Sequence, residues 1–375
     1  MQGERRVALT PRACEALIKV GMSTVVERNA GAEAGYPDSE YEARGTKVAT
    51  RDEVFAEAHV VTQVRTLGAN PRAGRDDLKR YRRGQVVVGM GEPLTALEEN
   101  AVLADAGVTY FALELVPRIT RAQSMDVLSS MACVAGYKAV LMAAEALPKM
   151  LPMMTTAAGT VSPARVLVLG AGVAGLQAIA TARRLGAVVS GYDIRPDTKE
   201  QVESLGAKFV VLDIQAQGAQ DKGGYAKQMD DAFYRRQREL LTAVLREQDL
   251  VITTAAVPGK RAPILVTEEM VSAMAQGSVV LDMAAERGGN CALTRAGETV
   301  VHGGVNIMGP VNIPATVPYH SSQMFAFNMA AFLKLIVSKG ELAINWDDEI
   351  VRETAVARDG QIVHARLATP VASQA

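Results

Sequence analysis

The chain has 375 residues, of which 49% are hydrophobic and 22% are charged, a composition typical of a folded globular protein. Lysine and arginine number 40 against 41 aspartates and glutamates, so we expect no general attraction to nucleic acid or to anionic lipid. The three cysteines, Cys14, Cys133 and Cys291, are far apart and in no metal-ligand spacing, which predicts reduced thiols and no metal site. The length predicts about two domains.

Short β-rich runs alternate with helical patterns over the first third of the chain. Thr10-Pro11 opens a helix with proline in its first turn. Residues 23–26, 59–64, 85–89 and 108–112 are predicted strands, and 126–147 is a long, mostly apolar helix. Strands separated by helix-length segments are typical of a parallel sheet with helices on both faces.

A second alternating unit starts near residue 164. Its predicted strands are 165–169, 188–192, 208–212, 250–254 and 278–283, and a long helix over 321–337 is expected to return the chain to the first domain. The sequence therefore predicts an α/β fold: two Rossmann-like, doubly wound parallel-sheet domains joined by long helices. We expect residues 1–128 plus 313–375 to form one domain and 129–312 the other.

The most apolar stretches, 139–154 and 324–337, are both interrupted by charged or polar residues. Neither reaches the roughly 18 uninterrupted apolar residues of a spanning helix. We therefore expect that the chain does not cross a membrane by itself.

The strongest motif is Gly170-Ala171-Gly172-Val173-Ala174-Gly175, which follows the apolar strand 165–169 and opens a helix. Gly170 permits a tight turn, Gly172 lets the backbone approach a pyrophosphate, and Gly175 lets helix and strand pack closely. The pyrophosphate then lies at the helix N-terminus. The motif predicts binding of an adenine dinucleotide.

Asp193 ends the next predicted strand, where a carboxylate accepts hydrogen bonds from ribose hydroxyls and repels a 2′-phosphate. This favours NAD(H) as the cofactor. Arg195, two residues on, could instead pair with the 2′-phosphate of NADP(H).

Residues 215–224 are polar and rich in glycine. Tyr225 and residues 226–229 follow and begin a helical pattern. Two interpretations stay open: a solvated linker, or a mobile flap over the cofactor cleft.

Several stretches resemble one known family. The run from Gly3 to Pro11 resembles the opening shared by alanine dehydrogenases and proton-translocating transhydrogenases. The run 117–130, Pro-Arg-Ile-Thr-Arg-Ala-Gln-Ser-Met-Asp-Val-Leu-Ser-Ser, is similar to the nucleotide-holding loop of the NAD(H)-binding α subunit of transhydrogenase, in its soluble first portion. Residues 153–175, 223–229, 253–260 and 286–290 are also similar to that family.

The resemblance implies Re/Si-specific hydride exchange between NADH bound here and NADP⁺ bound on a partner subunit, coupled to proton translocation by a membrane-spanning subunit. It also implies a homodimer in the cytoplasm, held at the inner membrane through its partners. Its nicotinamide residues would be Arg118, Gln123, Asp126, Ser129 and the flap residue Tyr225. Further cofactor contacts would come from Ile194, Gly224 and Ala255.

The loop also has an interpretation from its residues alone. Gln123 and Ser129 can bond a carboxamide, while Asp126 and Arg118 offer an ion pair that fixes the loop. Alternatively, the loop is only the polar N-terminal cap of the following helix, with Ser124 or Asp126 as the cap residue.

Two other functions remain open. An alanine dehydrogenase needs an acid/base group and a cation for the substrate carboxylate, but the stretches 63–67 and 88–94 contain no histidine. Hydride transfer between two nicotinamides needs no such group. A non-catalytic NAD-binding module would keep the glycine motif and Asp193, yet it has no need of the loop 118–129.

Both ends of the sequence depart from the family pattern. The resemblance implies a short strand ahead of Gly3, so either the polypeptide starts upstream or the first sheet lacks a strand. The C-terminal residues contain no membrane segment, which fits membrane spans on another chain.

Overall fold

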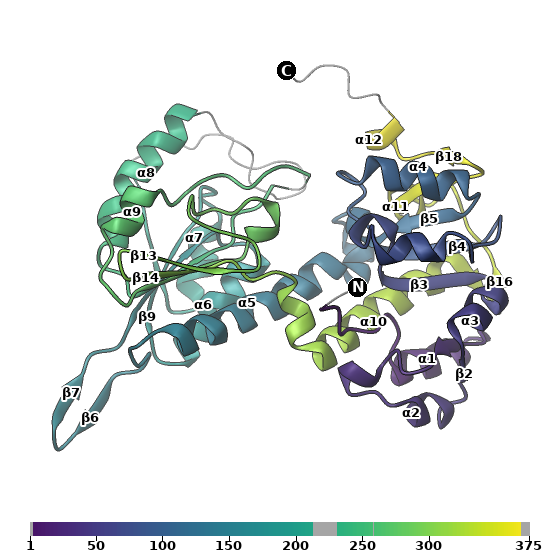
Figure 1. The fold of residues 1–375 in the computed structure, drawn as a ribbon, viewed down its shortest axis with the longest axis horizontal. Helices are drawn as coiled ribbons and strands as arrows, with labels where there is room; N and C mark the ends of the chain where they lie inside the picture. Colours follow the sequence, from purple (N-terminus) through teal and green to yellow (C-terminus); the bar gives the residue numbers. More distant parts are fainter. Residues whose placement is uncertain (1–2, 213–230, 258, 369–375) are drawn as a thin grey trace. The chain divides into compact units, whose positions relative to one another are not determined.

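The computed structural model describes residues 3–212, 231–257 and 259–368 (Figure 1). They divide into two compact units: residues up to Met131 together with those from Pro314 onward, and Ala132–Ile313. The predicted flap, with Gly224 and Tyr225, lies outside the described residues.

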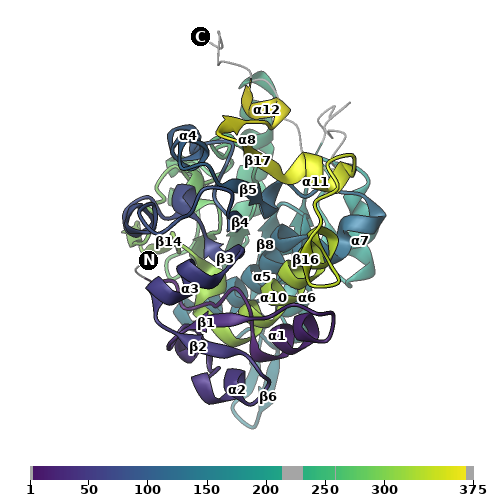
Figure 2. The ribbon, with the colours of Figure 1, turned by 90° about the vertical axis from the view of Figure 1, so that its right-hand side faces the viewer.

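The first unit is built on a five-stranded sheet in the order β18-β17-β5-β4-β3. Figure 2 shows β17, β5, β4 and β3 of this sheet one after another. Strands β3 (Val60–Arg65), β4 (Val86–Met90) and β5 (Thr109–Ala112) are parallel, as predicted. Strand β17 (Ala355–Arg358) is antiparallel to β5 and to β18 (Gln361–Ile362). The parallel centre confirms the predicted fold class, whereas the antiparallel edge was not predicted.

A separate two-stranded parallel sheet joins β1 (Val25–Glu27) to β2 (Lys47–Ala49). Helices surround the two sheets: α1 (Pro11–Ile18), α2 (Asp38–Glu42), α3 (Arg51–Glu57), α4 (Leu97–Asp105), α10 (Pro318–Ile336), α11 (Glu349–Thr354) and α12 (Ala365–Ala368). A short β15 (Val337–Ser338) and β16 (Glu341–Leu342) follow α10. Phe111, Phe325 and Phe332 lie at the centre of the main core of this unit.

The second unit has a seven-stranded sheet in the order β10-β9-β8-β11-β12-β14-β13. Five strands match predicted ones: β8 (Arg165–Leu169), β9 (Val188–Tyr192), β10 (Lys208–Phe209), β11 (Leu250–Thr253) and β12 (Val279–Asp282). Counted along the chain, the six parallel strands follow the doubly wound order 3-2-1-4-5-6. That order places a switch point between β8 and β11, at the carboxyl ends of the strands.

Further elements complete the second unit. Strand β13 (Thr299–His302) pairs antiparallel with β14 (Val305–Met308), and β6 (Met154–Thr156) forms a hairpin with β7 (Gly159–Val161). The helices are α6 (Val173–Arg184), α7 (Thr198–Ser204), α8 (Asp231–Leu245) and α9 (Glu268–Ser272). The two hairpins were not predicted because their strands are too short to show a clear alternation.

Helix α5 (Val127–Ala146) is long and apolar enough, by length and composition, to pass as a membrane span. Some of its side chains are core residues of this fold, and 44% of its most apolar 18-residue window is buried. Val127 and Met131 pack in the core of the first unit, and Ala139, Val140 and Ala143 pack in a core of the second. Burial within the protein therefore explains part of the hydrophobicity of α5.

Glu114 is a buried acid at the carboxyl end of the first sheet. Its Oε1 atom accepts hydrogen bonds from the backbone N–H groups of Gly91 (2.7 Å) and Glu92 (2.8 Å). Its Oε2 atom is buried with no hydrogen-bond partner among the described residues. Burial raises the pKa of Glu114 to about 7, against the opposing effect of the backbone donors.

This raised pKa predicts a pH-dependent stability. The folded state keeps a proton that the unfolded chain releases, so the stabilisation is complete below pH 4.5 and is lost as the pH rises through about 7. We expect Glu114→Gln to remove this fall in the free energy of unfolding, worth about 3 kcal/mol between about pH 5 and 8. Urea denaturation at several pH values measures it, with the exposed Glu98→Gln as control. Parallel pH profiles for wild type and Glu114→Gln would contradict the prediction.

Candidate functional site

The glycine motif forms the turn between β8 and α6, at the switch point of the second unit. Gly170 has a left-handed backbone with φ of 102°. A Cβ atom on Gly175 would lie 1.8 Å from the Gly170 carbonyl oxygen, so no side chain fits there. These two glycines are therefore required by the fold itself.

Gly172 differs, because a Cβ atom placed on it would meet nothing within 4 Å. Its φ of −79° and ψ of −171° are open to any residue. Gly172 begins α6 as its N-cap and supplies no side chain to cap the helix. The first-turn N–H groups of Val173, Ala174 and Gly175 follow this open position, and N–H groups at the start of a helix are the arrangement that binds anionic groups.

Asp193 lies just after β9 and is almost completely buried. Its Oδ2 atom accepts from the Ala171 N–H of the glycine turn at 2.7 Å. Its two oxygens also accept from Arg195: Oδ1 from Nε at 2.9 Å and Oδ2 from Nη2 at 2.8 Å. Asp193 therefore holds the turn in place, and Arg195 neutralises its charge.

The loops after β11 and β12 are held by two polar residues, Asp282, which the sequence did not single out, and Asn290, which ends the family-like stretch 286–290. Asp282, fully buried, accepts five hydrogen bonds, from Thr253 Oγ1, Thr294 Oγ1 and the N–H groups of Ala284, Asn290 and Cys291. Asn290 in turn donates to the carbonyl oxygens of Ala255 and Pro263. Ala255, a predicted contact residue, is thereby fixed at the end of β11. The only sequence signal for Asp282 was an acid ending an apolar strand.

Gly136 marks a close approach that was also missed. A Cβ atom there would lie 2.1 Å from the carbonyl oxygen of Ala174. Helix α5 therefore packs directly against the first turn of α6, with no side chain between the two backbones. This contact holds the N-terminus of α6 in position.

The loop 117–129 belongs to the first unit, in which a 3₁₀ turn over Thr120–Met125 precedes α5. Ala122 and Met125 are buried in the core, and Arg121 pairs with Asp348 at 2.7 and 2.9 Å. The Asn328 side chain donates to the Ser124 carbonyl at 2.8 Å. The loop is thus anchored, while the predicted residues Arg118 and Gln123 are exposed.

Asp126 caps α5 rather than forming the expected ion pair with Arg118. Its Oδ1 accepts from the Ser129 N–H at 2.9 Å and its Oδ2 from the Ser129 hydroxyl at 2.6 Å. The expected ion pair was wrong because a carboxylate one residue ahead of a helix reaches the third N–H of that helix more directly.

Three charged side chains form a cluster beside the start of α5. Both Glu4 carboxylate oxygens accept from Arg6, at 2.8 and 2.7 Å, and Arg65 Nε lies 3.3 Å from Glu4. Arg6 also contacts the Met131 sulfur at 3.2 Å and is almost completely buried. This cluster was not predicted, because its members are far apart in the sequence.

Each unit thus has a sheet with a parallel centre and an antiparallel edge, and the second has a glycine turn at the switch point of a doubly wound sheet. These features define a two-unit α/β protein of the dinucleotide-binding class. The chain belongs to the alanine dehydrogenase/PNT family: the N-terminal domain model matches residues 1–135 and the C-terminal domain model residues 139–365.

Individual relatives cover almost the whole chain. It is 46% identical to the first portion of the NAD(P) transhydrogenase α subunit of Rhodospirillum rubrum, over 97% of this chain and 96% of that one. It is 30% identical to alanine dehydrogenase of Halomonas elongata, over 97% and 93%. A solved structure of transhydrogenase from Sinorhizobium meliloti covers 97% of both chains at 45% identity, with a TM-score of 0.87.

Substitutions at the two glycines of the turn are expected to differ in their effect on stability. Gly175→Ala should lower the free energy of unfolding by roughly 1–3 kcal/mol, because the new methyl group overlaps the Gly170 carbonyl. Gly172→Ala is the matched control and should stay within about 0.5 kcal/mol of wild type, since its methyl group meets only open space. Urea denaturation distinguishes them. Equal stabilities would show that α6 can move away from β8.

Proposed function

We propose that this chain is the NAD(H)-binding subunit of a proton-translocating transhydrogenase. In this function, a hydride passes between NADH bound here and NADP⁺ bound on a partner subunit. The observation that carries the proposal is the 46% identity, over 97% of the chain, to a protein named as a transhydrogenase α subunit. The open glycine turn of the second unit supports it independently.

The second unit would hold the adenosine and pyrophosphate of NAD(H). The N–H groups of Val173 and Ala174 and the open side of Gly172 suit a pyrophosphate. Asp193, Ile194 and Arg195 would lie at the adenosine ribose, and Ala255 and Gly224 would add contacts. Because Arg195 already occupies the Asp193 carboxylate, binding of the ribose hydroxyls requires the guanidinium to release part of that carboxylate.

The first unit would hold the nicotinamide through Arg118, Gln123, Asp126 and Ser129, with Tyr225 closing from the flap. The structure supports direct contact for the exposed pair, Arg118 and Gln123. Asp126 and Ser129 bond each other and cap α5. They would act by holding the loop, so that Gln123 meets a carboxamide in a fixed orientation.

The proposed reaction requires little acid/base chemistry from this chain. The nicotinamide supplies the hydride, and hydride exchange between two such rings moves no substrate proton. The protein therefore contributes by positioning: an anchored loop and a fixed glycine turn set where the ring lies.

The alanine dehydrogenase alternative is disfavoured by the Glu4 cluster. That activity requires a cation for the substrate carboxylate, and both Arg6 and Arg65 lie against the Glu4 carboxylate. A substrate carboxylate would have to displace Glu4 from two guanidinium groups. A non-catalytic NAD-binding module would have no use for the exposed pair on the loop.

Partners follow from the proposed function. The chain would form a homodimer and bind an NADP(H)-carrying subunit and a membrane-spanning proton-channel subunit, without binding nucleic acid. It would lie in the cytoplasm, at the inner membrane through those partners. The hydride exchange would be Re/Si-specific and coupled to proton translocation.

A substitution in the loop 117–129 is expected to lower the rate of hydride exchange rather than the affinity for NADH. Mixed with an NADP(H)-binding partner subunit, Gln123→Ala should exchange hydride roughly ten- to a hundredfold more slowly, because a misplacement of about 1 Å can cost on the order of 10²-fold. Its NADH affinity should change several-fold at most. The matched control is Ser124→Ala, on the exposed part of the same turn, which should exchange at the wild-type rate.

Two results would contradict this prediction. Undiminished exchange by Gln123→Ala would leave the loop as a helix cap only. Oxidation of alanine by the purified chain with NAD⁺ would overturn the proposed function itself.

Asp193 predicts cofactor selectivity. Wild type should bind NADH at least about tenfold more tightly than NADPH, or about 1.4 kcal/mol. Asp193→Asn keeps an oxygen for the Ala171 N–H but removes the charge. Arg195 is then free to pair with a 2′-phosphate, so the ratio of the NADPH to the NADH dissociation constant should fall. Calorimetry with both nucleotides measures it. Equal dissociation constants in wild type would refute the assignment of Asp193.

A further inference from the structure

A strongly basic segment connects strands β3 and β4 of the first unit. Between residues 72 and 83, two acids stand against six basic residues, which are Arg72, Arg75, Lys79, Arg80, Arg82 and Arg83. The segment therefore has an excess of four positive charges, in a chain whose net charge is −1. The near-neutral total, which argues against a general attraction to anionic lipid, thus conceals a local positive potential.

The inward side of this segment is fixed to the sheet. Asp77 is buried, and Leu78 and Tyr81 pack against the core around Tyr110. The Tyr81 hydroxyl donates to the Gln63 side chain of β3 at 3.1 Å. The segment therefore lies in a defined position on the sheet, with one side turned toward the core.

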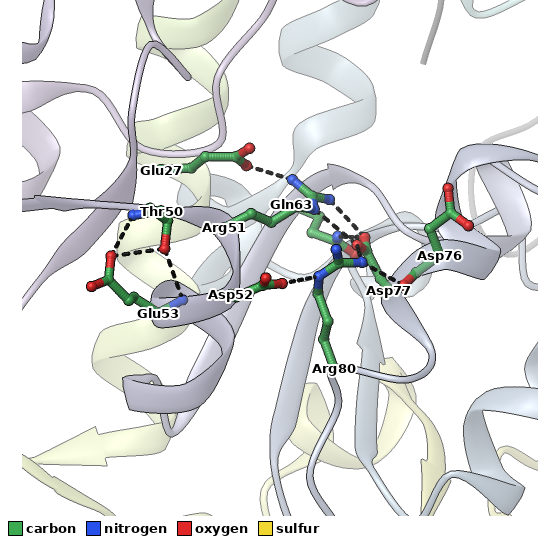
Figure 3. A network of polar contacts seen from close by, with 9 residues as sticks. All are labelled: Glu27, Thr50, Arg51, Asp52, Glu53, Gln63, Asp76, Asp77 and Arg80. Atoms are coloured by element: carbon green, nitrogen blue, oxygen red, sulfur yellow. Dashed lines mark hydrogen bonds and ion pairs between the residues drawn. The ribbon is translucent and has the colours of Figure 1, made fainter.

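A polar network also joins the segment to α3 (Figure 3). Arg51, in the first turn of α3, donates to the Asp77 carboxylate at 2.9 and 2.7 Å. Asp77 accepts a further hydrogen bond from the Gln63 side chain at 3.0 Å, and Arg80 pairs with Asp52 of α3. The charges of Asp77 and Arg80 are thus compensated within the fold.

The outward side of the segment carries cations. Arg72, Arg75 and Lys79 are exposed. They are three and four residues apart, which places them on one side of the 3₁₀ helix Ala73–Asp77 and the turn that follows it. Arg83 is exposed as well. Within the described part of the chain, the charged groups of these four residues have no hydrogen bond or ion pair.

The composition of this face distinguishes among anionic partners. Specific protein interfaces have an apolar centre enriched in aromatic side chains, but residues 71–84, all of which the structure describes, include no exposed large apolar side chain. Proteins that bind single-stranded nucleic acid stack bases on aromatic rings. The one aromatic residue of the segment, Tyr81, instead packs edge-on against Phe55. Exposed cations without an apolar centre fit the headgroup layer of a bilayer.

We propose that Arg72, Arg75, Lys79 and Arg83 form an electrostatic docking surface for a bilayer that contains anionic phospholipids. Clusters of about four to eight lysines and arginines bind such membranes, because each contributes roughly fivefold in affinity near the surface. The surface would hold the first unit against the headgroups without inserting any apolar side chain. This inference does not depend on the proposed function, which assigns membrane association to partner subunits.

Vesicle binding tests the surface with the purified 375-residue chain. The probes are sedimenting vesicles of phosphatidylcholine and phosphatidylglycerol in equal parts, and vesicles of phosphatidylcholine alone. At low ionic strength, wild type should bind the anionic vesicles at least about 100-fold more tightly than the neutral ones. Because the attraction is electrostatic, it should be lost when the salt concentration rises to about 0.5 M.

Two triple variants locate the attraction on the molecule. The segment variant changes three of its cations to glutamine: Arg72→Gln, Arg75→Gln and Lys79→Gln. It should bind anionic vesicles roughly 100-fold more weakly than wild type. The matched control makes the same change at three exposed cations of the second unit: Arg184→Gln, Lys199→Gln and Lys208→Gln. It should bind within about threefold of wild type, although its net charge equals that of the segment variant.

A further variant gives a gain that a folding defect cannot imitate. Asp76 is the exposed acid of the segment, and its side chain lies beside the cations. Asp76→Asn removes this negative charge and should therefore strengthen binding to anionic vesicles roughly fivefold.

Three outcomes would overturn the proposal. One is equal binding of wild type to anionic and neutral vesicles. Another is an equal loss of binding in the segment variant and in the matched control, which would show that only the net charge of the chain matters. The third is binding of a labelled DNA duplex by wild type, but not by the segment variant, at a salt concentration that releases the vesicles. That result would assign the surface to nucleic acid.

Discussion

Helix α6 starts so close to strand β8 that a methyl group on Gly175 would lie 1.8 Å from the Gly170 carbonyl oxygen. This close approach fixes the direction in which the first-turn N–H groups point, and every other component of the dinucleotide site is arranged around it. Helix α5 makes a second close approach at Gly136, against Ala174. The N-terminus of α6 is thus held between a strand and a helix by close backbone contacts, while the side-chain position of Gly172 meets nothing within 4 Å.

Buried carboxylates organise the loops around this turn. Asp193 accepts from the Ala171 N–H, and Asp282 accepts five hydrogen bonds from the segment after β12 and from Thr253. A carboxylate accepts several hydrogen bonds at once and so orders an irregular loop without a large apolar contact. In the first unit, Glu4 similarly holds Arg6 and Arg65. Guanidinium groups that already bind one carboxylate are poor sites for a second carboxylate, such as that of an amino-acid substrate.

The sequence predicted the long helices and central strands, but it did not predict the side-chain contacts or the short hairpins. The long apolar periodicities and the glycine spacing predicted the central strands, α5, α6 and α10 within a few residues. The ion pair expected between Asp126 and Arg118 was wrong, because Asp126 bonds the nearer Ser129. Local capping competes with longer-range pairing, and only the conformation of the chain decides between them. The short hairpins were missed for a related reason: two to four residues carry too little pattern to be distinguished from loops.

By itself, the sequence determined the class of fold and the position of the nucleotide turn, because each depends on residue types at short spacing. Strand, Gly170 to Gly175 and helix follow one another directly in the chain. Only the tertiary structure decided which charges meet and which strands pair. Glu4 and Arg65 lie sixty-one positions apart, and the paired strands β5 and β17 are separated by most of the chain. Contacts of that kind depend on how the sheets are stacked and ordered, and no local pattern of residues encodes that order.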